Sequence, residues 1–337
     1  MLLIDAIYIN DGGGKVLLDY LIEEIESTDV ECLYLLDNRI KNNHPSIKSS
    51  NLSLYIKSGL WRRLRFYRKH KSSFSKVFCM GNLPPNVKIE AEVITYFHSP
   101  LYLETPVELS LSERIKYILK RLVLKRFDRN TDLWLVQTEI MKRNFGEKFN
   151  INNTKVSLMP FYPPFDECSM DVAREDNTFL FVSNATAHKN HGRLVEAFCI
   201  FFDEYKIGKL ILTVSKEYEQ VVNLIDEKIA EGYPVVNVGF VGREHVKKLY
   251  LSSQYLIFPS VAESFGLGLV EAIDNGCKVI GADLPYTYAV CEPSIVFDPY
   301  KVESIICAFK QSLYEDVEIS TSLINDEVAE LISLLNT

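Results

Sequence analysis

The sequence predicts an α/β protein built from two doubly wound domains, each with a parallel sheet. Short apolar segments alternate with longer amphipathic segments along the chain, which is the order of strands and helices around parallel sheets. The 337 residues exceed the ~250–300 at which a single core stops growing. Prolines in the run Met159–Phe165 interrupt any regular element near the middle of the chain. We therefore expect a domain over 1–160, a second over 161–320, and a C-terminal helix over 321–337 that can pack back on the first.

The spacing of apolar residues divides each half into strands and helices. Continuous apolar runs in the first half predict strands at 2–9, 32–36, 93–97 and 133–137, and helical spacing predicts helices at 15–26, 61–71, 111–127 and 138–145. The second half repeats the pattern, with strands at 179–183, 209–214, 236–240, 255–258 and 278–281, and helices at 191–205, 217–230, 244–251, 265–275, 301–314 and 323–335. Ligands of such sheets bind beyond the carboxyl ends of the strands. We therefore expect the site between the two domains.

One segment of the second half has the features of a nucleotide-sugar site. The apolar strand Tyr255–Phe258 runs into a polar loop with Glu263, and a helix with glycines at its start follows. The N–H groups and partial positive charge of a helix N-terminus attract a diphosphate, and Gly266 and Gly268 let a ligand approach the backbone closely. Glu263 in the loop and Glu271 on the second helical turn can hold sugar and ribose hydroxyls on either side of that diphosphate.

This run, with its Pro-Ser turn, Glu263-Ser264-Phe265-Gly266 and Glu271-Ala272, resembles the retaining glycosyltransferases of the GT-B fold that carry a Glu-x7-Glu signature, the group 1 or family 4 type. Gly276–Gly281, where a helix ends and a strand begins, also fits. The resemblance covers roughly residues 155–300, and the N-terminal half matches only in outline. It implies an acceptor-side Rossmann-like domain facing a nucleotide-sugar-binding one across a cleft, with donor contacts from Ser264, Phe265, Gly266 and Leu267.

A second matching stretch is Phe179–Asn184, followed by His188-Lys189-Asn190. In the family a strand at this place ends in a Gly-Arg pair and a Lys follows, and both reach the phosphates. Lys189 matches that Lys, whereas Asn184 stands where the Arg would usually be. Arg243, after another predicted strand, is a candidate to complete the phosphate clamp.

The N-terminal half offers a glycine-rich loop and a histidine at predicted strand ends. Asn10–Lys15 follows the first strand, and its spacing is neither that of a P-loop nor that of a dinucleotide fingerprint. Gly13 and Gly14 can leave room for the donor diphosphate or the acceptor, as in proteins of the GT-B type, or they can simply form a tight strand-to-helix turn. His98 can bond a donor-sugar hydroxyl or the transferring centre, or it can cap a turn.

The resemblance implies transfer of a sugar from a nucleoside diphosphate sugar with retention at the anomeric carbon, and the catalytic candidates are Glu263, His98 and Lys189. Lys189, the helix N-terminus and Arg243 would stabilise the leaving diphosphate. Glu263 would orient the donor sugar, and Glu271 would bind the ribose. No carboxylate is placed as a covalent nucleophile, so a front-face displacement is expected. We expect no metal and no cofactor besides the donor substrate, because the family mostly works without a metal and the chain has no Asp-x-Asp.

The net charge of −8 hides a basic block, because Asn38–Ile89 has 12 basic residues and no acidic one. Lys57–Lys71 mixes aromatics with seven Lys and Arg, and Glu113–Arg129 predicts a basic amphipathic helix. Such segments lie on anionic membranes. We expect contact through residues 57–76 and 114–129, and hence a saccharide acceptor that is lipid-linked. Solvated helix faces whose apolar stripe is core are one alternative, and nucleic acid, for which the chain has no motif, is another that we do not expect.

The apolar runs, the N-terminus and the cysteines indicate in which cellular compartment the protein is expected. No apolar run reaches the 18 residues of a membrane span, and the N-terminus has no basic region or cleavage site. The seven cysteines are scattered without a Cys-x-x-Cys pair, which favours reduced thiols. We expect a cytoplasmic protein, peripheral at the inner face of the plasma membrane, in bacterial polysaccharide assembly such as lipopolysaccharide O-antigen or capsule.

Two other functions stay open at this point. A nucleotide-sugar epimerase or sugar phosphorylase of the same architecture would need acid/base carboxylates in the cleft, or a cofactor lysine or phosphate pocket, and the sequence shows no sign of these. A non-catalytic sugar-binding or assembly subunit is favoured by Asn184 and opposed by the intact Glu263, Glu271 and Lys189.

Overall fold

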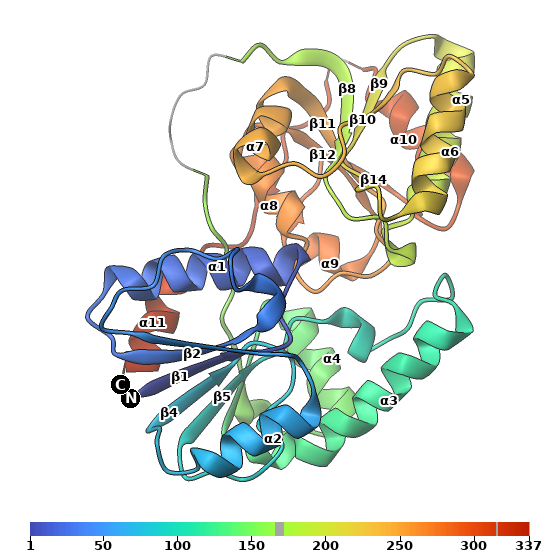
Figure 1. The fold of residues 1–337 in the computed structure, drawn as a ribbon. Coiled ribbons are helices and arrows are strands. Elements are labelled where there is room, and N and C mark those ends of the chain that lie inside the picture. The colour runs from blue at the N-terminus through green and yellow to red at the C-terminus, as the bar shows by residue number, and fades with distance from the viewer. Residues whose placement is uncertain (166–171, 315, 337) are drawn as a thin grey trace. The chain divides into compact units, whose positions relative to one another are not determined.

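The computed structural model describes residues 1–165, 172–314 and 316–336, and the chain forms two compact units. The first unit comprises Met1–Thr105, Ser110–Pro163 and Asn325–Thr337, and the second comprises Pro106–Leu109 and Pro164–Ile324. Each unit has its own parallel sheet with helices on both faces (Figure 1). The prediction of two doubly wound α/β domains is therefore confirmed.

The first sheet has seven parallel strands in the order β3-β2-β1-β4-β5-β6-β7. The bounds of these strands are β1 Leu2–Ala6, β2 Cys32–Asp37, β3 Leu52–Ile56, β4 Lys76–Cys79, β5 Glu92–Tyr96, β6 Leu133–Val136 and β7 Val156–Leu158. The strand order changes direction between β1 and β4. Ligands of doubly wound sheets bind at the carboxyl ends of the strands that flank such a switch point.

Helices cover both faces of this sheet, with α1 (Gly12–Ser27) and α11 (Val328–Asn336) on one face and α2 (Leu60–Lys69), α3 (Leu111–Phe127) and α4 (Glu139–Phe149) on the other (Figure 1). Helix α3 begins with a capping box, in which Ser110 and Glu113 each satisfy an N–H of the other residue. Helix α4 ends at Asn150, whose left-handed conformation suits a short polar side chain. Local sequence signals therefore explain where these helices begin and end.

Three strands of the first sheet were not predicted, and the reason differs from strand to strand. Strand β3 is a half-exposed edge strand, so its apolar run is interrupted by polar residues. Strand β4 has only four residues and lies within the basic block, and β7 has three. The predicted first strand was also too long, because β1 ends at Ala6 and a turn follows at Ile7 and Tyr8.

The second sheet repeats this topology with six parallel strands in the order β10-β9-β8-β11-β12-β14. The strands are β8 Glu175–Phe181, β9 Lys209–Leu212, β10 Val235–Asn237, β11 Ser253–Phe258, β12 Lys278–Ala282 and β14 Ile295–Phe297, and a small antiparallel pair joins β13 Cys291–Glu292 to β15 Thr321–Ser322. The helices are α5 His191–Tyr205, α6 Glu219–Ala230, α7 Arg243–Ser252, α8 Leu267–Asp274, α9 Pro285–Tyr288 and α10 Val302–Gln311. The switch point of this sheet lies between β8 and β11.

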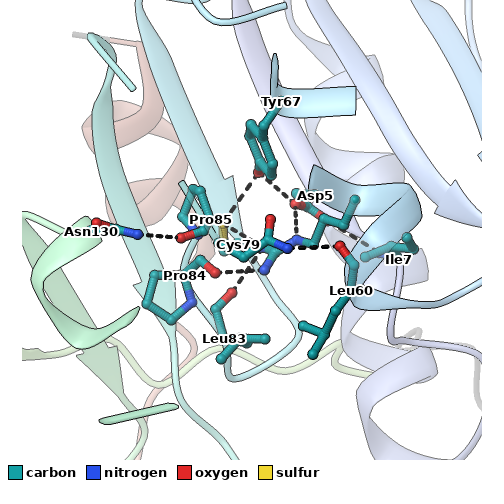
Figure 2. A network of polar contacts seen from close by, with 11 residues as sticks. Asp5, Ile7, Leu60, Tyr67, Cys79, Leu83, Pro84, Pro85 and Asn130 are labelled. Atoms are coloured by element: carbon teal, nitrogen blue, oxygen red, sulfur yellow. Dashed lines mark hydrogen bonds and ion pairs between the residues drawn. The ribbon is translucent and has the colours of Figure 1, made fainter. Parts of the chain in front are cut away.

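A buried polar network corrects the prediction that the whole basic block faces solvent or membrane (Figure 2). Arg63, on α2, is almost fully buried, and its Nε donates to Oδ2 of Asp5 on β1 at 2.7 Å. The hydroxyl of Tyr67 donates to the same oxygen at 2.5 Å. Burial disfavours a charged guanidinium, but Asp5, together with Tyr67, Cys79 and Tyr8, more than offsets burial, so the pKa of Arg63 is raised. Arg63 therefore fastens α2 to the sheet and is not available to a membrane.

Lys76 is a second basic residue of the predicted membrane segment that is buried. Its Nζ donates to the carbonyl of Leu334 on α11 at 2.6 Å and pairs with Glu92 at 3.3 Å.

Six cysteines lie among the described residues as free thiols, five of them buried, and Cys168 lies outside the described residues. In the parts of the chain that the structure describes, no helix is long and apolar enough to cross a bilayer.

Candidate functional site

The switch point of the second sheet brings two of the predicted catalytic residues into contact. Lys189 follows β8 in the short helical turn Ala187–Lys189, and Glu263 follows β11. Nζ of Lys189 donates to Oε1 of Glu263 at 2.5 Å, and the two side chains are 17% and 12% exposed. The two loops are also joined by their backbones, since the N–H of Val261 donates to the carbonyl of His188 at 2.8 Å. The site therefore holds a positive and a negative group that neutralise each other.

Asn190 fixes these loops, and the sequence analysis did not single it out. It has a left-handed backbone with φ of 64°, between the turn that ends at Lys189 and the start of α5. Its Nδ2 donates to the carbonyls of Pro259 at 3.2 Å and Pro299 at 2.8 Å, and the residue is buried. The sequence feature that could have pointed to Asn190 is a polar residue directly after Lys189, the lysine that matches the family. Asn190 thus connects the loop that carries Lys189 to the loop that carries Glu263.

The glycine-rich segment begins α8 in a way that differs from the prediction. The helix was expected at 265–275, but it begins at Leu267, and Gly266 is the N-cap with φ of 76°. This backbone conformation favours glycine, and a Cβ on Gly266 would also lie only 2.9 Å from Cδ1 of Leu269, which would have to move. Among the described residues no side chain caps the helix, and the N–H of Leu269 donates to the carbonyl of Gly266 at 2.8 Å, so the N–H groups of Leu267 and Gly268 are the ones that face the N-terminal end of the helix. Phe265 is 3% exposed, so only its backbone can reach a ligand.

Glu271, on the second turn of α8, is buried against two partners. Nη1 of Arg243 donates to its Oε1 at 2.6 Å, and the hydroxyl of Tyr250 donates to Oε2 at 3.2 Å. Burial raises the pKa of Glu271, and the Arg243 guanidinium opposes that rise. The guanidinium of Arg243 also lies over the ring of Phe165, 4.4 Å from its centroid. Arg243 is therefore placed by Glu271, the residue expected to hold the ribose.

Asn184, at the position where the family has an arginine, is exposed in the loop after β8. Its Oδ1 accepts a hydrogen bond from the hydroxyl of Thr186 at 3.2 Å. Lys189 and Arg243 are the basic side chains of the predicted clamp. The second unit therefore carries one cation beside Glu263 and one beside Glu271.

In the first unit the predicted residues gather at the switch point between β1 and β4. His98 follows β5, and its Nε2 lies 2.9 Å from the carbonyl oxygen of Met80, which follows β4. Burial lowers the pKa of His98 to about 4, so the imidazole is neutral at neutral pH. A Cβ on Gly14 would lie 3.1 Å from Cε1 of His98, whereas a Cβ on Gly13 would meet no atom within 4 Å. The glycine-rich start of α1 thus lies directly beside the imidazole.

The described part of the site contains no cluster of side chains that would bind a metal ion. Within residues 1–165, 172–314 and 316–336, no three His, Cys, Asp or Glu side chains gather as metal ligands would. His188 and His191 lie on either side of the Lys189-Asn190 pair in the sequence. His191 is buried against the ring of Phe181 at 4.7 Å. Metal independence stays a prediction.

Comparison with known proteins agrees with this geometry. Over 99% of this chain and 94% of the other, the structure resembles that of sucrose-phosphate synthase from Thermosynechococcus elongatus, with a TM-score of 0.72 at 15% identity. Two parallel-sheet domains of this topology define the fold as GT-B. Residues 169–325 match the family of glycosyl transferases group 1. This part of the chain, slightly less than half of its length, is therefore similar to the group 1 glycosyltransferases.

Two curated relatives narrow the comparison. The chain is 28% identical to O-antigen chain mannosyltransferase B of Escherichia coli over 149 residues, 42% of this chain and 39% of that protein. It is 23% identical to O-antigen chain mannosyltransferase RfbU of Salmonella typhimurium over 177 residues, 52% of this chain and 49% of that protein. The matches thus span at most about half the length of these relatives.

Proposed function

We propose that the chain is a retaining glycosyltransferase that moves a sugar from a nucleoside diphosphate sugar to a lipid-linked saccharide. The observation that carries the proposal is the Lys189–Glu263 pair at the switch point of the second sheet, next to the uncapped N-terminus of α8. A cation and free N–H groups suit a diphosphate, and a carboxylate suits sugar hydroxyls. Those groups lie where doubly wound sheets bind their ligands.

The charge pairing suggests how donor binding works. Without a donor, Lys189 and Glu263 satisfy each other. A diphosphate offers Lys189 more negative charge than one carboxylate, so it draws Nζ away. Glu263 is then left to accept hydrogen bonds from the hydroxyls of the donor sugar. Binding of the diphosphate and orientation of the sugar are thereby coupled through one ion pair.

The chemistry needs fixed positive groups around the leaving diphosphate. Lys189 and the first N–H groups of α8 supply them in this proposal, and Arg243 adds a further charge while Glu271 holds the ribose. A front-face displacement suits such a site, because the leaving phosphate itself accepts the proton of the acceptor hydroxyl. The new bond then forms on the face from which the diphosphate leaves, and the anomeric configuration is retained.

The acceptor is proposed to be an oligosaccharide of surface polysaccharide assembly. Two relatives act in O-antigen synthesis as their names state, and one solved structure that resembles the chain, WaaG, is described as involved in lipopolysaccharide biosynthesis. Their shared context favours a lipid-linked acceptor. Such an acceptor lies at a membrane surface, and the first unit has a helix suited to reach it.

Helix α3 exposes an apolar stripe that is not core. Leu111, Ile115, Ile118, Leu119 and Leu122 share one helix face, and their exposed fractions lie between 49% and 74%. On the opposite face Leu124 is buried. The alternative of an apolar stripe that is simply core therefore does not hold for α3. An exposed apolar stripe with basic residues beside it suits the surface of an anionic bilayer.

Two basic residues of α3 serve the fold instead of a membrane. Lys120 lies over the ring of Tyr117, 4.6 Å from its centroid, and Nε of Arg121 donates to the carbonyl of Tyr102 at 2.8 Å. The exposed basic positions of α3 are Arg114, Lys116, Lys125 and Arg126. The proposed membrane face is therefore the apolar stripe with these four residues beside it.

Helix α2 offers a second exposed basic face. Trp61 is 83% exposed, and with Arg62, Arg65 and Arg68 it lines a hollow of about 620 Å³. Tryptophan favours the interface between headgroups and acyl chains, and each arginine near an anionic surface contributes about 1 kcal/mol. We include this face in the proposed membrane contact, without the buried Arg63 and Lys76.

The experiment that tests the proposal measures release of nucleoside diphosphate from a panel of nucleotide sugars with lipid-linked acceptor. We expect one donor to be used and Glu263→Ala to lower the rate by roughly 100-fold or more, since a group aimed at the reacting sugar is lost. Glu303→Ala, an exposed carboxylate on α10, is the matched control and should keep the wild-type rate. Equal rates for the two variants would contradict the proposed role of Glu263.

A further inference from the structure

The turn that follows β4, Met80–Pro85, contacts His98 at two places. Oδ1 of Asn82 accepts a hydrogen bond from the backbone N–H of His98 at 2.7 Å. The carbonyl oxygen of Met80 lies 2.9 Å from Nε2 of the imidazole. Strands β4 and β5 are neighbours in the sheet, so both contacts form where the two strands end. The turn therefore determines where the imidazole lies and how it is oriented.

These contacts also determine which ring nitrogen carries the proton. A carbonyl oxygen only accepts, so the 2.9 Å contact to Met80 requires a proton on Nε2. Nδ2 of Asn82 is also near Nε2, but at 3.3 Å, and it would favour the opposite tautomer. The side-chain amide of Asn82 cannot flip by 180°, because its oxygen accepts a hydrogen bond from the N–H of His98. The contact of Nε2 with the Met80 carbonyl is shorter than its contact with Asn82 and therefore the stronger hydrogen bond, which places the proton on Nε2.

The other ring nitrogen is left without a partner in the part of the chain that the structure describes. No hydrogen bond from residues 1–165, 172–314 or 316–336 reaches Nδ1 of His98. Nδ1 is also not among the fully enclosed polar atoms that lack a partner. It therefore remains open to a ligand beside the glycine-rich start of α1, where the lack of a side chain on Gly14 lets Cε1 of the imidazole lie close to the backbone.

The turn is held in place from outside the site (Figure 2). The two Nη atoms of Arg63 donate to the carbonyls of Pro84 at 2.5 Å and Leu83 at 2.9 Å. Nδ2 of Asn130 donates to the carbonyl of Pro85 at 2.8 Å. Asn82 itself has a left-handed backbone with φ of 61°, which a short polar side chain tolerates. The buried guanidinium thus supports the turn that supports the histidine.

We propose that Asn82 is a positioning residue for His98: it holds the imidazole against the Met80 carbonyl with the proton on Nε2 and leaves Nδ1 as a bare acceptor. A bare acceptor takes a hydrogen bond from a hydroxyl but repels a fully ionised phosphate oxygen, which has no proton to donate. His98 is therefore suited to a sugar hydroxyl and not to the diphosphate. This assignment of the ligand rests on the proposed function, whereas the tautomer does not.

The test is a long-range ¹H–¹⁵N correlation spectrum of the full chain, with ¹⁵N-labelled histidine, at pH 7 and without ligand. The signals of His98 are identified by their loss in His98→Asn. We expect the Nε2–H form to exceed Nδ1–H by about tenfold, the ratio that one hydrogen bond of ~1.4 kcal/mol gives. A wild-type spectrum with the proton on Nδ1 would overturn the inference.

Two variants of Asn82 test whether this residue determines the tautomer of His98. Asn82→Gly tolerates the left-handed backbone but removes the acceptor of the His98 N–H, and we expect both tautomers to become populated. Asn82→Asp keeps an acceptor there and places a second one near Nε2, and we expect the Nε2–H form to stay dominant. An unchanged tautomer ratio in Asn82→Gly, with an unchanged melting temperature, would refute the role of Asn82.

A kinetic comparison then tests the ligand. The side-chain oxygen of His98→Asn can occupy the place of Nδ1, whereas the amide of His98→Gln reaches the place of Nε2 and can donate to Met80. If Nδ1 binds the hydroxyl, His98→Asn keeps about tenfold more kcat/KM than His98→Gln. The reverse order would contradict the assignment of Nδ1. A chain without any transfer activity would refute the proposed function, and the spectrum would still decide the tautomer.

Discussion

At the scale of single residues, the candidate site is a set of charges that satisfy one another. Lys189 is bonded to Glu263, and Arg243 to Glu271. The sequence predicted these residues for ligand contacts, and spacing alone could not show the pairing, because Lys189 and Glu263 come from loops 74 residues apart. The local pattern predicts which residue types occur at a strand end. Which of them touch depends on the strand order of the sheet.

His191 has a measurable consequence for stability, because neither of its ring nitrogens has a partner among the described residues and the side chain is 3% exposed. Burial lowers its pKa to about 3, and Lys189 adds to that effect. The unfolded chain, with a histidine pKa near 6.5, therefore binds a proton below that pH that the folded chain does not bind. The free energy of unfolding consequently falls as the pH drops from about 6.5 towards 3.

His191→Phe should remove this dependence. Between pH 6.5 and 5 the second unit should lose about 2 kcal/mol less in the variant than in the wild type. The measurement is the melting temperature at pH 7.5 and 5.0, where the variant should show the smaller drop. His245→Phe, at an exposed position of the same unit, is the control and should behave as wild type. An equal drop in His191→Phe and wild type would show that the histidine is protonated while folded.

At the scale of elements, α2 carries both buried and exposed basic residues, although the sequence predicted a single basic block. Helical spacing predicted α2 itself, but a long cationic side chain gives no sign in the sequence that it is buried. Only the sheet shows that Arg63 faces Asp5, while Arg62, Arg65 and Arg68 face outward. In the same way, α3 was predicted as a helix, and the sequence could not show whether its apolar stripe was core or exposed. Contacts with the rest of the unit decide both questions.

Substitutions on α2 should therefore fall into two classes. Arg63→Met leaves the buried Asp5 carboxylate with the hydroxyl of Tyr67 but without its cationic partner, and should cost about 3–5 kcal/mol of stability. The triple variant Arg62→Ala, Arg65→Ala and Arg68→Ala should keep the wild-type melting temperature and bind anionic liposomes less tightly. Thermal unfolding and liposome sedimentation measure the two effects. A wild-type melting temperature for Arg63→Met would contradict the buried network.

The apolar stripe of α3 should dominate membrane binding. Ile118→Ser with Leu122→Ser should weaken binding to anionic liposomes by roughly 100-fold, because two large apolar side chains no longer enter the bilayer. The matched control is Ile319→Ser with Leu323→Ser, at two comparably exposed positions of the second unit. Liposome flotation at low and high salt separates this apolar part from the charged part, which salt weakens. Unchanged flotation of the α3 variant would contradict the proposed membrane face.

At the scale of the whole molecule, the two sheets follow the same strand order, and the sequence predicted both as doubly wound. That prediction succeeded because alternation of strands and helices admits few topologies. The strands it missed are β3, β4 and β7 of the first sheet, β14 of the second, and the pair β13 and β15; they are short or lie at a sheet edge, where burial leaves little pattern in the sequence. The candidate donor residues lie in the second unit, and His98, Gly13 and Gly14 lie in the first.

The most direct test of the central claim is the melting temperature with UDP, GDP, ADP, dTDP and CMP, for the wild type and for Lys189→Ala. The account predicts that one nucleoside diphosphate stabilises the wild type, by about 2.7 kcal/mol at a concentration of 100 times its Kd, and stabilises Lys189→Ala much less. Absence of any shift in the wild type, or an equal shift in the variant, would contradict a donor site at Lys189 and Glu263.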